Sequence, residues 1–355
     1  MLNTKILDLL NTEFSSLKDL MSNCSHHSET VISPFHMEGD ILKHTMMVYD
    51  CAKEMYPKDD ILQSAILLHD LGKPMATGYN ENNGRKNFIG HAGLSFYLAI
   101  DVLNKLGDEI SVADKKMILN IISLHGEFYG ILNPEVMTTK FIKKVAERFT
   151  NQIHLMDYVF RHILCDHLGR ITDEVFDKEV LNNAIFNDIL FQTASNSKQY
   201  VKKKAEVVFM VGPPNCGKTT YQLANYANCN VLSRDDVVTS IFPVDTDYNE
   251  CFRNVDHDAI DKIVSAKFKE LLNKNKTFVI DMTNMTRKFR RKYLSNIPKN
   301  IYNTIAIVFA TGYNTIMERN GNRVKKTLAK DVIVNKMRQF MVPAYDEFDE
   351  INWIF

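Results

Sequence analysis

Apolar residues recur at intervals of three and four over the first half of the chain. The spacing is clearest in the segments 41–56, 59–73, 91–107, 113–126 and 152–170. It places the apolar side chains on one face of a helix, so each segment is predicted to be an amphipathic helix. No convincing strand pattern occurs there, and the Asn- and Gly-rich residues 79–87 predict a loop. We therefore expect an all-α bundle.

The pattern changes after residue 204. Short runs of β-branched and aromatic residues, at 206–211, 230–233, 277–281 and 303–310, alternate with amphipathic segments. This alternation is typical of a parallel sheet covered by helices. The polar stretch 192–204 has little to bury and predicts a linker. We expect a helical domain at 1–191, a linker at 192–204 and an α/β domain at 205–355, whose acidic-then-apolar end packs back through Trp353 and Phe355 or forms a dimer contact.

Composition and charge narrow the class of protein. The 355 residues, 45% hydrophobic and 24% charged, can bury two cores and exclude a disordered or fibrous chain. Lys+Arg and Asp+Glu balance at 43 each, so a nucleic-acid partner would need a local basic patch. The six cysteines form no CxxC pair, and Asp8 and Glu13 interrupt the N-terminal apolar residues. These features predict a cytoplasmic protein with no membrane span.

A phosphate-binding loop follows the first strand of the second half. Its glycines let main-chain N–H groups approach phosphates at the start of a helix, Lys218 can bridge β- and γ-phosphate oxygens, and the Thr219 hydroxyl can bind Mg²⁺. The motif therefore predicts ATP and Mg²⁺ binding. The residues expected to bind the nucleotide are Gly212, Asn215, Cys216, Gly217, Lys218, Thr219 and Thr220.

Polar residues also follow the next two strands. Asp235 is a candidate general base for a hydroxyl acceptor, although the same residue could cap a helix. Asp281 is a candidate ligand of Mg²⁺, and Thr283 and Asn284 could orient the acceptor.

Two arginines near residue 320 suggest a lid. Arg319 and Arg323 flank a glycine and could neutralise the transferring phosphoryl group, although pairing with Glu318 on the surface would also explain them. Basic residues are concentrated at 286–293, interleaved with Phe289 and Tyr293, and at 319–326. These segments predict either a solvated helix face or a surface that follows a phosphate backbone.

The motifs GPPNCGKTT, LSRDD, DMTN and RNGNR resemble, in order and spacing, those of the polynucleotide 5′-kinase family over residues 205 to about 345. The resemblance implies that Lys218 and Thr219 hold ATP and Mg²⁺, that Asp235 is the general base and that Arg319 and Arg323 contact phosphates. One position departs from the family pattern. Val238 stands where many members have an arginine for an acceptor phosphate, so either the acceptor differs or its recognition shifts to Arg234, Arg287 or Arg290.

Ten of the eleven histidines precede residue 171, which indicates separate chemistry in the first half. His69 and Asp70 are adjacent near a helix end and can converge on one ion. His44 and Asp166, on neighbouring predicted helices, would complete a ligand set for a transition metal such as Mn²⁺, Co²⁺, Ni²⁺, Zn²⁺ or Fe²⁺, and water on such an ion ionises near neutral pH. Each residue alone could instead be a buried structural group.

The ordered H…HD…D series resembles the HD phosphohydrolase superfamily, which implies that these four residues bind metal. The family also places ligands of a second metal, or phosphate contacts, at positions like His91 and His125. Lys73 and Arg170 follow two of the ligands by one turn and could bind the substrate phosphate, or could be surface residues. His36 is expected at the pocket rim, whereas no role is predicted for His26, His27, His154, His162 or His167.

The whole chain resembles bacterial fusions of an HD domain with a polynucleotide kinase, which heal broken nucleic-acid ends. The resemblance implies removal of a 2′,3′-cyclic, 2′ or 3′ phosphate by the first half and 5′-phosphorylation by the second. Its partners would be RNA or DNA ends, and a separate ligase would use the product. Two alternatives stay open: a nucleotide-salvage fusion of a nucleotidase with a small-molecule kinase, and a regulator whose P-loop only senses ATP.

Overall fold

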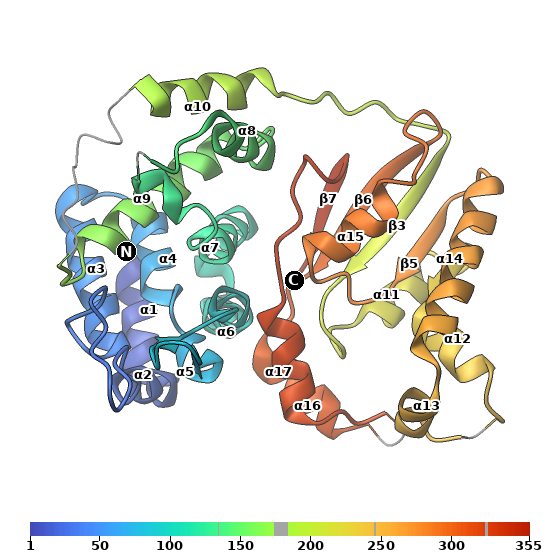
Figure 1. Ribbon diagram of the computed structural model, residues 1–355, viewed down its shortest axis with the longest axis horizontal. Helices are drawn as coiled ribbons and strands as arrows, with labels where there is room; N and C mark the ends of the chain where they lie inside the picture. Colours follow the sequence, from blue (N-terminus) through green and yellow to red (C-terminus); the bar gives the residue numbers. More distant parts are fainter. Residues whose placement is uncertain (134, 174–183, 245, 324–325) are drawn as a thin grey trace. The chain divides into compact units, whose positions relative to one another are not determined.

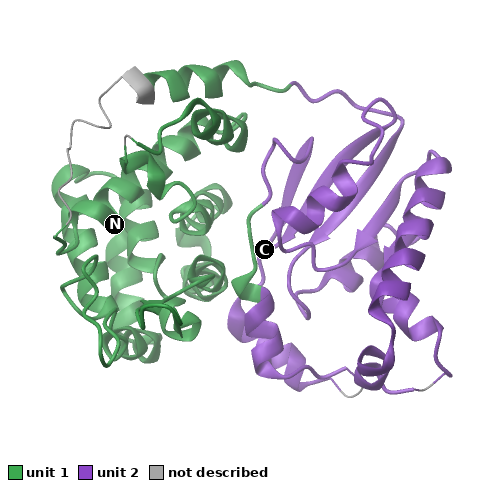
Figure 2. Cartoon of the chain, viewed as in Figure 1, with its two compact units in different colours: residues 1–198, 337–342 green, residues 199–336, 343–355 purple. Residues whose placement is uncertain are grey.

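A computed structural model describes residues 1–133, 135–173, 184–244, 246–323 and 326–355 (Figure 1). The chain forms two compact units (Figure 2). Unit 1 contains residues 1–198 and 337–342, and unit 2 contains residues 199–336 and 343–355. The predicted linker overlaps a helix that continues to Ser195, and the short segment 337–342 was not expected in the first unit.

Unit 1 is a helical bundle. Its helices are α1 (Leu2–Asn11), α2 (Ser15–Ser22), α3 (Ile41–Met55), α4 (Asp60–Leu68), α5 (Lys73–Ala76), α6 (His91–Lys105), α7 (Val112–Leu124), α8 (Thr139–Arg148), α9 (Ile153–Leu168) and α10 (Ala184–Ser195). The five predicted helices are confirmed. The predicted loop at 79–87 instead contains a short antiparallel hairpin, β1 (Gly78–Tyr79) with β2 (Lys86–Asn87).

Helix α4 lies at the centre of this bundle. Seven consecutive residues, Leu62 to Leu68, are buried, and the helix packs against α1, α3, α7 and α9. Asp59 caps its start by accepting a hydrogen bond from the main-chain N–H of Leu62 at 3.0 Å. Five of these seven residues are apolar, as burial on all sides favours, and the Gln63 amide donates a hydrogen bond to the carbonyl oxygen of Tyr56 at 2.8 Å. The C-terminal end of the helix, where His69 and Asp70 follow, therefore lies inside the protein.

Unit 2 is an α/β domain with a five-stranded parallel sheet in the order β4-β5-β3-β6-β7. Its strands are β3 (Ala205–Val211), β4 (Asn230–Ser233), β5 (Phe278–Asp281), β6 (Tyr302–Phe309) and β7 (Glu350–Ile354). Its helices are α11 (Lys218–Asn225), α12 (Arg234–Ser240), α13 (Tyr248–Asn254), α14 (His257–Asn273), α15 (Arg287–Leu294), α16 (Tyr313–Gly321) and the first seven residues of α17 (Lys330–Arg338).

The four predicted strands are confirmed, and the C-terminal segment adds a fifth. Trp353 is in register with Val308 of β6, so this segment completes the sheet. Because all strands are parallel, the P-loop after β3, Asp235 after β4 and Asp281 at the end of β5 meet at one edge. Among the helices that the structure describes, none combines the length and hydropathy needed to cross a bilayer.

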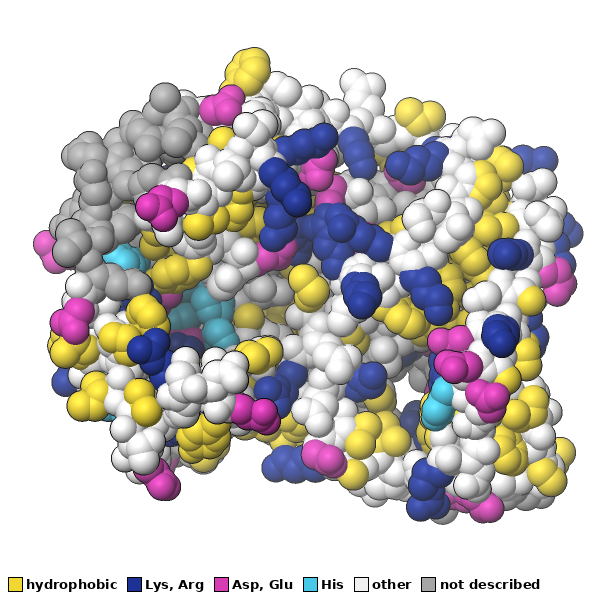
Figure 3. Space-filling model, in the orientation of Figure 1, with side chains coloured by type: hydrophobic (Ala, Val, Ile, Leu, Met, Phe, Trp, Pro, Cys, Tyr) yellow, Lys and Arg dark blue, Asp and Glu magenta, His cyan; other side chains and the backbone are white. Residues whose placement is uncertain are grey.

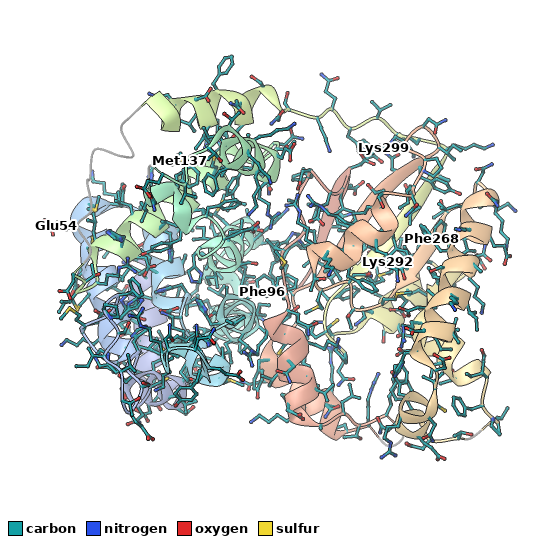
Figure 4. The ribbon with its side chains drawn as sticks, viewed as in Figure 1. Glu54, Phe96, Met137, Phe268, Lys292 and Lys299 are labelled. Carbon is teal, nitrogen blue, oxygen red and sulfur yellow. The ribbon has the colours of Figure 1, made fainter. Side chains whose placement is uncertain are left out.

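Residues 337–342 pack into unit 1 although they lie between α17 and β7 in sequence. The Phe340 ring lies 4.4 Å from the Phe96 ring of α6, measured between centroids (Figure 4). The Arg338 guanidinium donates to the carbonyl oxygen of Ile89 at 2.9 Å, and Arg148 donates to that of Val342 at 2.8 Å. Both apolar packing and hydrogen bonds from arginine side chains to main-chain carbonyl oxygens therefore attach this segment to the helical bundle.

We expect Phe340→Ala to destabilise unit 1 by about 3–5 kcal/mol, because the ring is 4% exposed and its removal leaves a cavity. The measurement is the thermal unfolding of the full-length protein, followed by its helical circular dichroism signal. Phe191→Ala is the matched control, since that ring is 72% exposed and should change stability little. Equal unfolding temperatures for the two variants would contradict the packing described above.

Candidate active sites

The four predicted metal ligands of unit 1 converge on one point. His44 comes from α3, His69 and Asp70 follow α4, and Asp166 lies on α9. His44 Nε2 lies 2.9 Å from Asp166 Oδ1, and His69 Nε2 lies 3.1 Å from Asp70 Oδ2. The diagonal distances, His44 to Asp70 and His69 to Asp166, are both 3.8 Å. The structure thus gathers residues from positions 44 to 166 into one buried cluster.

His91 and His125 form a second group around the same aspartate. His91 Nε2 lies 3.4 Å from Asp70 Oδ1 and 2.9 Å from His125 Nε2. His44, His69 and Asp70 can hold one cation, and Asp70, His91 and His125 can hold another. The two carboxylate oxygens of Asp70 face the two groups. This placement favours the ligand role of His91 and His125 over a phosphate contact.

Hydrogen bonds at Nδ1 orient these imidazoles. The Nδ1 atoms of His69, His91 and His125 lie 2.7, 2.8 and 2.7 Å from the main-chain carbonyl oxygens of residues 66, 88 and 122. His44 Nδ1 lies 2.8 Å from the buried carboxylate of Glu38. Each imidazole therefore donates outward through Nδ1 and presents Nε2 to the centre, as metal-binding histidines do.

The turn after α4 brings Asp70 and His91 together. A Cβ atom at Gly72 would lie 2.5 Å from the carbonyl oxygen of His91 and 2.6 Å from the main-chain nitrogen of Ser95. The Gly72 N–H donates to the Ser95 hydroxyl at 2.9 Å. Only glycine permits this approach, which fixes the start of α6 beside Asp70.

Several buried polar atoms of the cluster lack hydrogen bonds. Both carboxylate oxygens of Asp70 and Nε2 of His69 have ion-pair contacts but no hydrogen-bond partner among the described residues. Buried polar groups without partners are costly, and a divalent cation would satisfy them. Imidazole nitrogens with carboxylate oxygens are a donor set that suits transition metals.

Burial and neighbouring charges keep three of the candidate ligands in the forms that bind metal. Burial alone would raise the pKa of Asp70, but its electrostatic interactions with His69 and Lys73 outweigh burial and hold this pKa well below its usual value. Burial lowers the pKa of His91 to about 4 and that of His125 well below 6.5. Carboxylate and neutral imidazole are the forms that bind metal, so Asp70, His91 and His125 are ready to bind a cation at neutral pH.

We expect metal-free unit 1 to lose stability as the pH falls from about 7 to about 5. Burial lowers the pKa of His36 to about 4 and that of His162 to about 3, whereas the unfolded chain binds these protons below pH 6.5. In this window each such histidine lowers the free energy of unfolding by about 1.4 kcal/mol for each unit by which the pH falls. Burial also lowers the pKa of His44, but two carboxylate hydrogen bonds raise it overall, so this residue opposes the trend. Denaturant unfolding with a chelator at both pH values is the measurement, and a pH-independent midpoint would contradict it.

The two predicted phosphate-binding cations have different partners in the structure. Lys73 is 7% exposed, and its ammonium lies 2.7 Å from Asp70 Oδ2 and 3.1 Å from His26 Nε2, so it is not a surface residue. The Arg170 guanidinium lies 2.8 Å from His167 Nδ1 and over the Tyr129 ring. Figure 3 shows histidine side chains at the bottom of a hollow in unit 1.

The second site lies at the sheet edge of unit 2. Gly217 has φ of 104°, a left-handed conformation suited to glycine, and begins α11. The Lys218 ammonium donates to the carbonyl oxygens of Gly212 and Pro213 at 3.0 and 2.6 Å. The exposed Thr219 hydroxyl lies 3.5 Å from Asp281 Oδ2, which is the arrangement expected for two groups that share a magnesium ion.

The geometry also decides the role of Asp235 in its helix. Ser233, not Asp235, caps α12, because its hydroxyl accepts a hydrogen bond from the main-chain N–H of Asp236 at 3.1 Å. Asp235 lies in the first turn, where its carboxylate is 2.5 Å from the Lys326 ammonium. Asp235 is therefore not the helix cap, and its carboxylate is paired with Lys326 in this structure.

The lid arginines lie at and beyond the end of α16. Arg319 Nη1 donates to the carbonyl oxygen of Asn215 in the P-loop at 3.4 Å, whereas Arg323 is exposed. Between them, the buried Asn320 amide accepts a hydrogen bond from Asn215 Nδ2 at 3.1 Å and donates to the carbonyl oxygen of Leu328. Asn320 attaches the lid to the P-loop, and the sequence reasoning missed it.

Two models of known protein families match parts of the chain. Residues 41–151 match the family model of the HD domain, and residues 207–343 match a model described as an AAA domain, which covers P-loop kinase-like proteins. The chain joins an HD domain to a P-loop kinase-like domain. A comparison with curated proteins gives no match. Domains of the first kind bind divalent metals, and P-loop kinases use ATP with Mg²⁺, so the chain combines a hydrolase with a kinase.

Three histidines for which the sequence predicts no ligand or catalytic role lie close to the candidate ligands or to residues that contact them. His36 Nδ1 lies 3.1 Å from Glu38, and the His36 ring stacks on that of His26 at 4.0 Å. These residues lie outside regular helices, so no periodicity pointed to them. The His162 ring lies 4.9 Å from the His69 ring. Its spacing of four residues from Asp166 on one helix was the signal that could have identified it.

The kinase-like domain requires corrections to the predicted acceptor residues. Asn284 is fully buried, and its amide donates to the carbonyl oxygens of Met210, Ile280 and Met282, so the prediction that it orients an acceptor is wrong. The main chain of Thr283 accepts a hydrogen bond from the Gly212 N–H at 3.0 Å, which joins β5 to the P-loop.

The candidate acceptor arginines differ in exposure. Arg290 is fully buried and forms a bidentate pair with Glu347 at 3.1 and 2.7 Å, which excludes it from acceptor binding. Arg287 pairs with Asp346 and is mostly buried. Arg234 pairs with Asp261 at 3.2 Å and keeps 24% of its side chain exposed. Of the three, Arg234 is the most accessible to a ligand.

The basic segment 286–293 forms α15, which is amphipathic. Tyr293 faces inward, with its ring 5.0 Å from that of Phe268 on α14 (Figure 4). Lys288, Arg291 and Lys292 are exposed. The structure thus places a basic, exposed face on this helix. That exposure is compatible with both predictions, a solvated helix face and a surface that follows a phosphate backbone.

Proposed function

We propose that the protein heals broken nucleic-acid ends. In this proposal the HD domain removes a 2′,3′-cyclic, 2′ or 3′ phosphate, and the kinase-like domain uses ATP to phosphorylate a 5′-hydroxyl. The observation that supports the proposal is that one chain carries two candidate sites, a histidine–carboxylate cluster in the HD domain and a P-loop with Asp235 in the kinase-like domain. Opposed activities would be futile on one small molecule, but they act productively on the two different ends of a break.

At the HD site, His44, His69, Asp70 and Asp166 would hold one divalent metal, and Asp70, His91 and His125 a second. Such ions polarise phosphate oxygens and lower the pKa of water. Lys73 supplies positive charge beside Asp70, and Arg170 would add a second cation; both would bind the substrate phosphate and stabilise the charge that builds on its oxygens. Glu38 holds the His44 imidazole in the orientation that ligation requires.

At the kinase site, the main-chain amides of the P-loop and Lys218 would bind the phosphates of ATP, while Thr219 and Asp281 would hold Mg²⁺. Asp235 takes the proton of the acceptor hydroxyl, and the hydroxyl oxygen forms a bond to the γ-phosphorus. The bond from that phosphorus to the β–γ bridging oxygen breaks, and ADP leaves with the electron pair. Arg319 and Arg323 would neutralise charge on the transferring group.

A second candidate is a nucleotide-salvage fusion with a nucleoside or another small hydroxyl compound as acceptor. Val238 favours it, because this residue is fully buried and cannot bind an acceptor phosphate as an arginine at the same place could. The exposed basic face of α15 favours the polynucleotide instead, since a small acceptor needs no such surface.

The test is transfer of labelled γ-phosphate from ATP to a 5′-hydroxyl oligonucleotide, with free nucleosides as competitors. The end-healing proposal predicts a labelled oligonucleotide that nucleosides in excess do not suppress. Transfer to nucleosides alone would support salvage. ATP binding or hydrolysis without transfer to either acceptor would support a nucleotide-sensing regulator and overturn the kinase assignment.

A further inference from the structure

Lys326 and Tyr248 surround the candidate general base of the kinase-like domain. The Lys326 ammonium lies 2.5 Å from Asp235 Oδ2 and 3.7 Å from the centroid of the Tyr248 ring. The Tyr248 hydroxyl is also hydrogen-bonded to Asp235, and burial together with the Asp235 charge raises the pKa of Tyr248. The hydroxyl therefore stays protonated and donates to the carboxylate. A cation and an aromatic ring thus lie where an acceptor hydroxyl must arrive.

The aromatic surface continues along α13. The Phe252 ring lies 4.7 Å from the Tyr248 ring, and the Arg234 guanidinium lies over Phe252 at 5.8 Å. Both rings are only half-buried. Exposed aromatic rings beside cations are the means by which proteins bind nucleobases without reading their edges.

Stability does not account for the contact between Lys326 and Asp235. The two side chains are 32% and 46% exposed, and ion pairs of such exposure contribute little to stability. The segment that carries Lys326 is held near α13, because Asn249 Nδ2 donates to the carbonyl oxygen of Thr327 at 3.4 Å. The contact therefore positions a solvent-accessible charge at the acceptor side of Asp235 rather than forming a buried structural pair.

We propose that Lys326 and Tyr248 form the acceptor-binding site of the kinase. The Lys326 ammonium binds the phosphate that follows the terminal nucleoside, which the buried Val238 cannot do, and the terminal base stacks on Tyr248 and Phe252. When this phosphate attracts Lys326, the Asp235 carboxylate is released to accept the hydroxyl proton. The inference rests on the proposed function, since it requires a 5′-hydroxyl acceptor with a phosphate on its 3′ side.

The test compares a nucleoside 3′-monophosphate with the corresponding nucleoside as acceptors of full-length protein. We expect Lys326→Ala to raise KM for the 3′-monophosphate about tenfold or more, as loss of one charge-assisted contact requires, with little change for the nucleoside or for ATP. Lys326→Arg should restore the lower KM. Lys330→Ala, an exposed lysine on α17, is the matched control and should leave all three constants unchanged. Tyr248→Ala should raise KM for both acceptors, and Tyr248→Phe should retain stacking.

The outcomes separate this inference from the proposed function. An active wild-type kinase whose acceptor KM is unaffected by Lys326→Ala would overturn the inference alone. So would an equal rise in KM for ATP and for both acceptors, because that result indicates a general loss of structure. A wild-type protein that transfers phosphate to neither acceptor nor to a 5′-hydroxyl oligonucleotide would overturn the proposed function itself.

Discussion

Asp70→Asn is expected to abolish phosphoesterase activity while leaving 5′-kinase activity unchanged. Asp70 belongs to both groups of candidate ligands, and each of its carboxylate oxygens faces one of them. Loss of its charge would weaken both cation sites at once. Metal ions contribute several kcal/mol to phosphate hydrolysis, so we expect a fall of about a thousandfold or more. We would measure the removal of phosphate from an RNA end that carries a 2′,3′-cyclic phosphate, and the metal content of the purified protein.

Asp50→Asn is the control for this substitution. Asp50 lies on α3 with a 70% exposed side chain, so its loss should change neither activity. The kinase activity of the Asp70 variant reports that unit 2 is folded, and the helical circular dichroism signal, compared with that of the wild type, reports that unit 1 is folded. A folded Asp70→Asn protein that keeps its phosphoesterase activity and its metal would show that this cluster is structural.

Asp235→Asn and Lys218→Ala are expected to abolish phosphoryl transfer and spare the phosphoesterase. An amide in place of the Asp235 carboxylate cannot accept the hydroxyl proton, and a lost general base costs about a hundredfold to ten-thousandfold. The Lys218 ammonium lies at the carbonyl oxygens of the P-loop, where the phosphates would bind. Its loss should also raise KM for ATP, whereas the loss of Asp235 should lower kcat with little effect on that constant.

Asp236→Asn provides a matched control for the kinase variants. Asp236 is the next residue in α12, but its side chain is exposed. Its main-chain N–H donates to the hydroxyl of Ser233, which caps the helix, and the substitution does not change that hydrogen bond. Full kinase activity is expected. If Asp236→Asn were as damaging as Asp235→Asn, general electrostatics near the P-loop and not proton transfer would explain both.

The sequence predicted the parts of the protein in which local pattern decides the structure. The P-loop needs adjacent glycines, a lysine and a hydroxyl, and His69 with Asp70 follows an apolar helix, so each motif is contained in one short segment. Strands β3 to β6 have apolar runs long enough to be recognised. Only the structure, however, brings His44 and Asp166 within 2.9 Å across more than a hundred residues.

The parts that could not be predicted depend on partners distant in sequence. Glu38 contacts His44 from an irregular segment, and Phe340 packs against Phe96 although most of the kinase-like domain lies between them in sequence. Arg290 and Asn284 are polar residues in basic or polar surroundings, which predicts exposure. Their burial is possible only because Glu347 and main-chain carbonyl oxygens satisfy their hydrogen bonds.

The most direct test of the account uses one nicked RNA with a 2′,3′-cyclic phosphate on one side of the break and a 5′-hydroxyl on the other. With ATP, Mg²⁺ and Mn²⁺, the wild-type protein should convert both ends, as the fragment masses would show. Asp70→Asn should leave only the cyclic phosphate, and Asp235→Asn only the 5′-hydroxyl. If either folded variant lost both conversions, the two sites would not be independent. If the wild-type protein converted mononucleotides and left both RNA ends unchanged, the sites would not act on the two ends of a break.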